Sequence, residues 1–434
     1  MDLSVIIILI SFGALLVLMI LGVHVGIAMG IIGFAGCCYF LGLKSALAAL
    51  ASIPYMCTTN FLLVAIPLYM LMGGFATHAG IASEFYEAAS KLIGNIRGGL
   101  AIATIVGCGA FAAISGSSLA TAATLGGIAI PEMRKLGYDP RIAAGCVAAG
   151  GTLGIMIPPS TLFILYGWLT EVSISKLFIA GIVPGVLTAL MYILTILIYP
   201  IFIPKAYVPT EVVSWGVRVR STKKFLPVTG IFVLVIGGIY GGVFTPTEAA
   251  AVGMMCVFIL GVIRKKLSFS KMHDAVLQAG WATAMTFTIV IGAYLLAYYL
   301  AQNKFAEVLS QFVLGMGVSR WAVFFGIVVV YLILGMLLDT LSMIVLTVPI
   351  MFPVAVSQGF DPIWFGVIIC KLIELALMTP PVGMNIYVIA GVAREIPLHH
   401  IFIGVFPFII ADLITLTILI IFPQIILFLP RTMS

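Results

Sequence analysis

Charged residues are scarce in this chain of 434 residues: 8% are Asp, Glu, Lys or Arg, while 63% are hydrophobic. A soluble globular domain usually carries about 25% charged residues. A chain of this size with so few charges cannot cover a globular surface with polar groups. The composition therefore excludes a soluble enzyme, a nucleic-acid-binding protein and a secreted disulfide scaffold. It predicts an all-α polytopic membrane protein.

The chain also lacks the motifs that usually carry enzyme chemistry. It contains no HExxH, Gly-x-Ser-x-Gly or Walker loop. All seven cysteines lie in apolar runs, without a C-x-x-C pair or a His-rich cluster that would indicate a transition-metal site. We therefore predict that the chain is not an enzyme. The first 22 residues are apolar but lack a basic n-region, so they are predicted to be a first membrane span.

Two parts of the chain match each other when the sequence is shifted by 222 residues. Residues 131–164 align with residues 353–386 at nine identical positions of 34, most of them Pro, Gly or Asp. These residue types fix backbone geometry, so their recurrence in register predicts a recurring backbone path. We predict two copies of one unit, at residues 1–203 and 225–434. A cytoplasmic linker rich in Lys and Arg, at 204–224, would join them.

Each predicted unit has the same order of segments. It starts with three spans, followed by an amphipathic helix in the membrane interface, a re-entrant hairpin, a helix broken by Pro-Pro and a final span. Each hairpin arm would be about 25 Å long, which is less than the ~30 Å hydrocarbon core and favours a hairpin over two spans. The segments of the first unit are 3–22, 24–42, about 55–77, 83–94, 98–133, 141–171 and 178–203. Those of the second are 225–243, 245–263, 279–301, 303–315, 321–353, 361–391 and 403–429.

Five crossings per unit is an odd number, so the second unit would be inverted relative to the first. Lys and Arg residues in the loops divide 15 to five between the two sides. The positive-inside rule places the richer side in the cytoplasm and both termini outside. The hairpins then enter from opposite sides, and their tips face each other near the midplane. This is the architecture of secondary transporters.

Polar groups gather at the hairpin tips and the Pro-Pro breaks. Hydroxyls and freed carbonyls suit a hard cation such as Na⁺, while a helix N-terminus suits an anion. The alternatives are that the Gly-Ser tip only allows close helix packing and that Pro-Pro only bends the helix. The residues predicted to bind Na⁺ are Ser115, Gly116, Ser117 and Pro158 at one site and Thr340, Thr379 and Pro380 at a second. Those predicted to bind substrate are Ser118, Ser160, Asp339 and Asn385.

Several ionisable side chains lie inside apolar segments. Asp339 at the second tip is a functional candidate; it would bind a hydroxyl or amine, or order the site, because a carboxylate repels an acid. Lys371 and Glu374 are three residues apart on one helix and can pair, so neutralisation and function both remain open. Asp412 has no evident partner, and facing another subunit would supply one. His24 lies at a span end and is expected to be solvated.

Motifs spread over nearly the whole chain resemble those of the large membrane subunit of tripartite ATP-independent periplasmic (TRAP) transporters. They lie at residues 98–100, 113–118, 130–133, 137–139, 157–160, 180–185, 242–250 and 378–385. One departure is His24, where the family commonly has Pro after Gly-Val. We expect His24 to lie far from the tips.

The resemblance implies an elevator-type, Na⁺-driven importer of a small organic acid anion, such as a dicarboxylate, sialic acid or a similar carboxylate or sulfonate. It implies a bacterial or archaeal inner membrane. It also implies two partners, a small membrane subunit and a periplasmic substrate-binding protein. The order of hairpin and broken helix also looks like that of divalent-anion/Na⁺ symporters, so a self-sufficient symporter is the alternative function. A channel or a non-transporting membrane scaffold is a third possibility.

Overall fold

The computed structural model describes residues 3–94, 96–202, 207, 216, 221–223, 225–335 and 338–433. These residues form helices and connecting turns, with no strand among them. Six of the described helices are long and apolar enough to cross a membrane, or seven if a bent pair counts as one span. The chain is therefore an all-α polytopic membrane protein, as its composition predicts. Most of the predicted linker at 204–224 lies outside the described residues.

The helices of the first half are α1 Leu3–Ile20, α2 Val25–Leu41, α3 Leu43–Thr58, α4 Ala65–His78, α5 Ile81–Ile93, α6 Gly99–Ser115, α7 Ser118–Lys135, α8 Pro140–Met156, α9 Thr161–Thr170 and α10 Ile174–Phe202. Those of the second half are α12 Leu226–Tyr240, α13 Pro246–Ile263, α14 Phe269–Gln302, α15 Phe305–Gly315, α16 Arg320–Gly335, α17 Thr340–Ser357, α18 Pro362–Ala376, α19 Met384–Val392, α20 Leu398–Ile421 and α21 Gln424–Arg431. The starts of α7 and α17, and of α8 and α18, differ by 222 residues.

One predicted span of the first half is wrong. Residues 55–77 do not form one helix, because α3 ends at Thr58 and α4 begins at Ala65. The hydroxyl of Thr59 donates to the carbonyl of Tyr55, and the side chain of Asn60 accepts a hydrogen bond from the N–H of Leu62. Such local side-chain bonds compete with a helix. The corresponding helix of the second half, α14, runs unbroken.

The predicted final span over 403–429 is also too long. Helix α20 ends at Ile421, and the short helix α21 follows Pro423. Phe422 has φ −116° and ψ 73°, outside the helical region. A residue before proline is disfavoured in the helical conformation because it clashes with the proline ring.

The predicted helix starts after both hairpins are confirmed. Asp139 and Asp361 cap α8 and α18 through their side chains, and each helix has Pro at its first position. Arg141 donates hydrogen bonds to the carboxylate of Asp139, and these hold the pKa of that carboxyl below its usual value. Asp-Pro therefore fixes where both broken helices begin.

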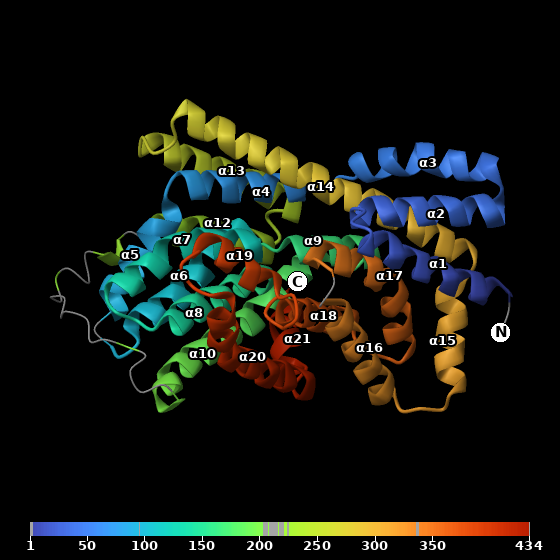
Figure 1. The fold of residues 1–434 in the computed structure, drawn as a ribbon. Helices are drawn as coiled ribbons and strands as arrows, with labels where there is room; N and C mark the ends of the chain where they lie inside the picture. Colours follow the sequence, from blue (N-terminus) through green and yellow to red (C-terminus); the bar gives the residue numbers. More distant parts are fainter. Residues whose placement is uncertain are drawn as a thin grey trace.

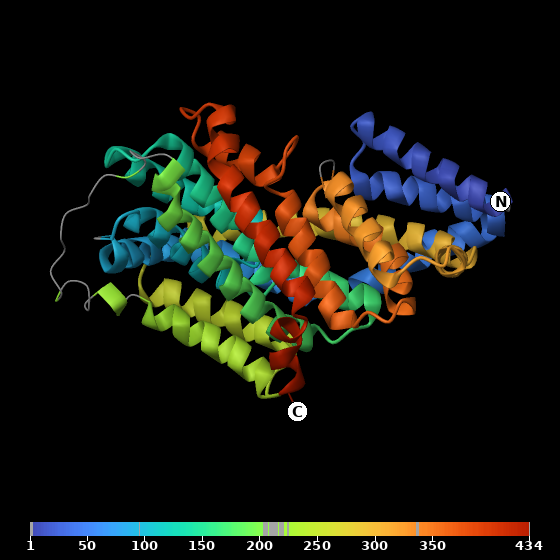
Figure 2. The ribbon, with the colours of Figure 1, turned by 90° about the horizontal axis from the view of Figure 1, so that it is seen from below.

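The centre of the molecule is built around α8 and α18. All residues of α8 from 142 to 156 and of α18 from 364 to 376 are buried. Helix α8 packs against α6, α7, α10, α18, α19 and α20, and Figures 1 and 2 show it enclosed by these helices. Backbone broken inside the membrane must be covered by protein or line a cavity, which fits the burial of these helices. Both first arms of the broken helices thus lie in the protein interior.

Helices α2 and α14 make the closest pair in a second layer, above the hairpins in Figure 1. Their backbones touch at Gly26 and Gly292, where a Cβ added to Gly292 would lie 1.8 Å from the carbonyl oxygen of Gly26. Only glycine permits this approach. Helix α14 also lines a cavity between the two hairpin tips. The contact between α2 and α14 therefore fixes the position of one wall of that cavity.

Replacing Gly292 with alanine should therefore separate α2 from α14. We expect G292A to lower the free energy of unfolding by about 1–3 kcal/mol, measured by thermal unfolding of the purified chain in detergent. Gly280 lies on the same helix with no atom within 4 Å of an added Cβ, so G280A is the matched control. Equal melting temperatures for the two variants would contradict this packing.

Candidate substrate and cation site

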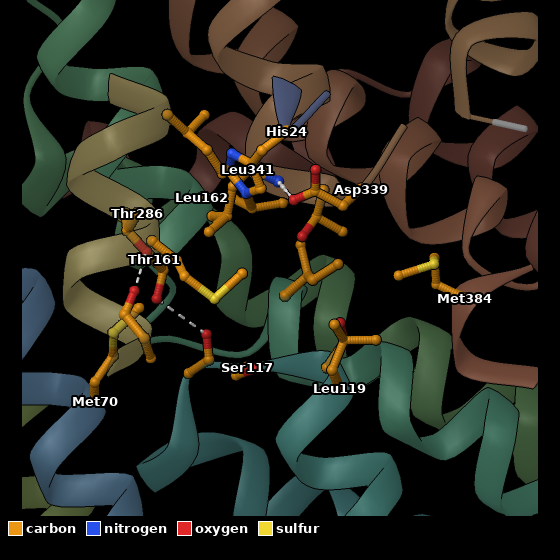
Figure 3. Close-up of a pocket in the computed structure, with 17 residues that line it drawn as sticks. His24, Met70, Ser117, Leu119, Thr161, Leu162, Thr286, Asp339, Leu341 and Met384 are labelled. Carbon is orange, nitrogen blue, oxygen red and sulfur yellow. Dashed lines mark hydrogen bonds between the residues drawn. The ribbon is translucent and has the colours of Figure 1, made fainter. Parts of the chain in front are cut away.

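A cavity of about 330 Å³ lies between the two hairpin tips. Gly116, Ser117 and Ser118 line it from the first tip, between α6 and α7, and Asp339 and Thr340 line it from the second, before and at the start of α17. Figure 3 shows Ser117 and Asp339 reaching this space from different elements. Helix α14 and the start of α9 form further walls. The structure thus brings together two tips that lie more than 200 residues apart in the sequence.

The other predicted site residues do not line the cavity. They are Ser115, Pro158, Ser160, Thr379, Pro380 and Asn385. Thr379 follows the end of α18 and donates its hydroxyl hydrogen to the carbonyl of Leu375 in the last turn of that helix. The predicted second Na⁺ site therefore has only Thr340 on the cavity wall.

The first tip is a sharp turn set by its residue types. Gly116 ends α6 with φ 60°, and a Cβ there would lie 2.7 Å from the carbonyl oxygen of Pro159. Ser117 caps α7 by accepting a hydrogen bond from the N–H of Ala120. The hydroxyl of Ser115 lies 2.8 Å from that of Thr121. Glycine is needed both for the left-handed backbone and for the close approach to the Pro-Pro break.

The first Pro-Pro break supplies oxygen atoms beside this tip. Pro158 and Pro159 have no N–H, so the carbonyls of Gly154 and Ile155 lack their i+4 donors. A Cβ on Gly154 would lie 2.6 Å from the carbonyl oxygen of Ser117, which shows how tightly α8 meets the tip. The hydroxyl of Ser160 is buried without a hydrogen-bond partner. Hydroxyl and carbonyl oxygens in such a group suit a hard cation.

The second tip is organised by Asp339. Its Oδ2 accepts hydrogen bonds from the N–H groups of Leu341 at 3.2 Å and Ser342 at 3.4 Å, and its Oδ1 accepts one from the hydroxyl of Ser342. Asp339 is therefore the N-cap of α17 as well as a cavity wall. Of the roles open from the sequence, these contacts favour ordering of the site.

The second Pro-Pro break differs from the first in its hydrogen bonds. The carbonyls that Pro380 and Pro381 would leave without i+4 donors belong to Ala376 and Leu377. They accept instead from the N–H groups of Thr379 and Asn385. The side chain of Asn385 donates to the carbonyl of Ala148 on α8, and its Oδ1 is buried without a partner. Asn385 thus ties the second break to the first half of the chain.

His24 is a site residue that the sequence did not indicate. It was expected to lie far from the tips, but it lines the same cavity as Ser117 and Asp339. Its Nδ1 is buried without a hydrogen-bond partner. His24 directly precedes α2, so the packing of α2 on α14 carries it to the cavity. Only this long-range contact, which has no local signal in the sequence, could have placed it there.

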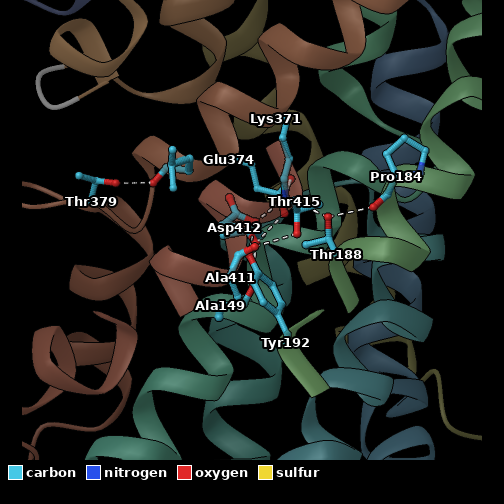
Figure 4. Close-up of polar contacts among 12 residues, drawn as sticks. Ala149, Pro184, Thr188, Tyr192, Lys371, Glu374, Thr379, Ala411, Asp412 and Thr415 are labelled. Carbon is cyan, nitrogen blue, oxygen red and sulfur yellow. Dashed lines mark hydrogen bonds and ion pairs between the residues drawn. The ribbon is translucent and has the colours of Figure 1, made fainter. Parts of the chain in front are cut away.

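Asp412 has partners within the chain, so the idea that it faces another subunit is wrong. Its Oδ1 accepts hydrogen bonds from Lys371 at 2.5 Å and from the hydroxyl of Tyr192 at 2.8 Å. The predicted pairing of Lys371 with Glu374 is confirmed, at 3.1 Å. Figure 4 shows these side chains meeting between helices. The cluster lies outside the residues that line the cavity.

Two solved transporter structures share this fold. The YdaH transporter of Alcanivorax borkumensis superposes with a TM-score of 0.62 at 16% identity, covering 89% of this chain and 90% of that one. MtrF of Neisseria gonorrhoeae superposes with a TM-score of 0.61 at 13% identity, covering 88% and 85%. At such identities the likeness concerns the fold alone.

Sequence relatives give a closer match. The chain is 37% identical to the C4-dicarboxylate TRAP transporter large permease protein DctM of Pseudomonas aeruginosa, over 90% of this chain and 93% of that protein. It is 34% identical to the isethionate TRAP transporter permease protein DctMQ of Oleidesulfovibrio alaskensis, over 88% and 60%. It is 32% identical to the sialic acid TRAP transporter large permease protein SiaM of Vibrio cholerae, over 86% and 87%.

A family model described as the DctM component of the tripartite ATP-independent periplasmic transporter matches residues 12–425. This range includes both hairpins and both broken helices. With these relatives, it shows that the chain is a transporter subunit and not an enzyme. The chain belongs to the DctM family, the large permease subunits of TRAP transporters.

Proposed function

We propose that this chain imports a small organic acid anion, driven by a Na⁺ gradient, and binds it in the cavity between the two tips. The observation that carries the proposal is that the N-terminal ends of α7 and α17 wall one cavity. The first N–H groups of a helix have no intrahelical acceptor and point toward an anion. At α17 two of these groups already bond to Asp339. The first tip, around Ser118, is therefore the main anion contact.

The chemistry of the cavity fits a carboxylate or sulfonate. Ser118 and Thr340 offer hydroxyls, and the unpartnered Nδ1 of His24 offers a further polar group. Ser160 and Asn385, buried just behind the wall, complete the proposed substrate set. Relatives named for C4-dicarboxylate, isethionate and sialic acid all act on such anions. A volume of about 330 Å³ suits a small organic anion.

Two Na⁺ sites would couple the gradient to substrate binding. The first comprises Ser115, Gly116, Ser117 and the carbonyls before Pro158, where oxygen atoms crowd together. The second comprises Thr340, Thr379 and the carbonyls before Pro380. Among the described residues no group of three or more His, Cys, Asp or Glu side chains could hold a metal ion. Neutral oxygen ligands of this kind favour Na⁺ over a transition metal.

The moving body of the elevator would comprise both hairpins and both broken helices. Helix α9, after the first break, packs against α17 of the second hairpin, and α19, after the second break, packs against α7 of the first. These reciprocal contacts tie the four elements together. In this proposal the two halves are inverted repeats, both termini are periplasmic and the protein lies in the inner membrane. Helices α5 and α15 serve as arms to the scaffold.

A small membrane subunit and a periplasmic binding protein would complete the transporter. The family description names a tripartite system. The relative named DctMQ is longer, and this chain covers 60% of it. The few spans left outside the moving body form a thin frame, which a small subunit would enlarge. The alternative, a self-sufficient divalent-anion symporter, needs neither partner.

Reconstitution tests the coupling ion and the partners together. Proteoliposomes containing the chain, its small subunit and substrate-loaded binding protein should accumulate substrate only under an inward Na⁺ gradient, measured with radiolabelled organic acid. Omitting either partner should abolish uptake. Full activity on a pH gradient in Na⁺-free buffer would contradict Na⁺ coupling. Robust accumulation by the chain alone would favour the symporter.

Asp339 offers a test of the tip. D339A should abolish uptake by the reconstituted transporter, because it removes a cavity wall and the cap of α17, at a cost in stability of about 0.5–2 kcal/mol. Asp361 is the matched control, since it caps α18 with bonds of 2.9 and 3.0 Å but does not line the cavity. D361A should lose similar stability and keep uptake per folded molecule. If both variants transport equally well, Asp339 has no role in the mechanism.

His24 offers a test of substrate binding. H24A should raise the KM for the organic acid by about 10- to 100-fold, since a hydrogen bond to a charged group contributes about 1.5–3 kcal/mol. The exposed His399 does not line the cavity, so H399A is the control. An unchanged KM for H24A in the uptake assay would remove His24 from the proposed site.

A further inference from the structure

A cluster of polar side chains lies in the interior, apart from the cavity (Figure 4). Lys371 and Glu374 come from α18, Asp412 from α20, Tyr192 from α10 and Thr152 from α8. All five are fully buried. Nothing in the proposed transport cycle uses them. A charged group in such a place is costly unless it is paired, so the charges and protons of the cluster must balance.

The charges do not balance if every group is ionised. One ammonium, that of Lys371, faces two carboxylates, those of Glu374 and Asp412. The net charge would be −1 in a region with no exposed surface. An uncompensated buried charge is strongly destabilising. Deprotonating Lys371 would worsen the imbalance, so the cluster needs one additional proton on a carboxyl group.

Counting the donor hydrogens of the cluster against its contacts shows which contact lacks a hydrogen. Lys371 has three ammonium hydrogens, and its Nζ has three partners, at 2.9 Å to Thr188, 3.1 Å to Glu374 and 2.5 Å to Asp412. Tyr192 has one hydroxyl hydrogen, which serves Asp412 at 2.8 Å. Every hydrogen of these two side chains is therefore used.

Thr152 has one hydroxyl hydrogen but three contacts with oxygen atoms, the longest being 3.2 Å to the hydroxyl of Tyr192. Its Oγ1 lies 2.7 Å from the carbonyl oxygen of Ala149 and 2.8 Å from Oε1 of Glu374. When that hydrogen goes to the carbonyl of Ala149, the hydroxyl oxygen of Thr152 can still accept a hydrogen bond. The contact between Thr152 and Glu374 then lacks a hydrogen unless Glu374 supplies it.

Asp412 is a poor alternative for the extra proton. Its Oδ1 already faces the ammonium of Lys371 and the hydroxyl of Tyr192. Its Oδ2 is buried with no hydrogen-bond partner, so a proton there would be a donor without an acceptor. A buried donor without an acceptor costs more free energy than a proton on Glu374, because Thr152 can accept a hydrogen bond from Glu374.

We infer that Glu374 is a proton-binding site. At neutral pH its Oε1 carries a proton and donates it to Oγ1 of Thr152, while Oε2 accepts from Lys371. The proton neutralises the cluster and completes its hydrogen bonds. The titratable groups that face Glu374 are Lys371 and Cys370 from its own helix, Asp412 from α20 and Tyr192 from α10, while α8 contributes the hydroxyl of Thr152.

The position of the proton has a consequence for the fold. Thr152 and Glu374 are separated by 222 residues, so the shift that matches the two halves places these residues opposite each other. Their contact joins α8 to α18, the two helices at the centre. Loss of the proton would leave one ammonium between two ionised carboxylates, a buried net charge of −1 at the junction of the halves. The contact between the halves then weakens as pH rises.

Infrared spectroscopy of the wild-type chain, in lipid nanodiscs at neutral pH, tests this directly. We expect a carbonyl-stretch band from a protonated, buried carboxyl group. The band should shift when glutamate is labelled with ¹³C in its side chain and should disappear in E374Q. The absence of any such band, or a band that shifts with labelled aspartate instead, would overturn the assignment.

Thermal unfolding as a function of pH provides a second measurement. Because the folded chain holds a proton that the unfolded chain releases, the melting temperature of the wild type should fall as pH rises above about 4.3, the ordinary pKa of glutamate, until the folded chain also loses the proton. E374Q keeps a neutral donor for Thr152, so it should match the wild type at the acidic end of this range and lose the slope. E307Q, at an exposed glutamate, should keep it. An unchanged slope in E374Q would overturn the proposal, and if E374Q does not fold, the infrared band decides.

Discussion

Hydrocarbon cannot hydrogen-bond to a peptide group, and the rest of this structure depends on that constraint. A helix that breaks inside the membrane exposes N–H and carbonyl groups that only protein or trapped water can satisfy. The first arms of both broken helices, α8 and α18, are buried along nearly their whole length. The first break lies against the tip at Gly116, while the carbonyls before the second accept hydrogen bonds from the N–H groups of Thr379 and Asn385. The same packing leaves a cavity between the two tips, whose wall includes Ser117, Ser118, Asp339 and Thr340.

Hydrogen bonds connect the second Pro-Pro break to α8, and α8 to the charged cluster. Asn385 at the second break reaches α8, and Thr152 of α8 contacts Glu374 of α18. Both of these polar contacts between the halves involve the central helix α8, while α9 and α19 cross to the opposite hairpins. In the proposed elevator mechanism, these contacts would make the hairpins and the broken helices move as one body. This coupling gives an elevator motion a physical basis, since one body moves only if its parts do not slide past each other.

Local chemistry made much of this fold predictable from the sequence. Pro, Gly and Asp act on the backbone within a few residues, so the Pro-Pro breaks, the tip at Gly116 and the caps Asp139 and Asp361 could be placed without any knowledge of packing. The errors arose where the deciding contact is made by a polar side chain in an apolar run or by a residue far away in the sequence. The break between α3 and α4 depends on Thr59 and Asn60 side-chain bonds that apolar composition concealed. The partner of Asp412 is 41 residues away on another helix, and His24 reaches the cavity only because α2 packs on α14.

The central claim is that both tips wall one space that the substrate occupies. Cross-linking tests it most directly, in a chain whose seven native cysteines have been replaced and which carries S117C and T340C. A short bifunctional thiol reagent should join the two tips in the reconstituted transporter, and organic acid substrate with Na⁺ should protect against the reaction. Failure to cross-link, or cross-linking that is indifferent to substrate, would contradict the account.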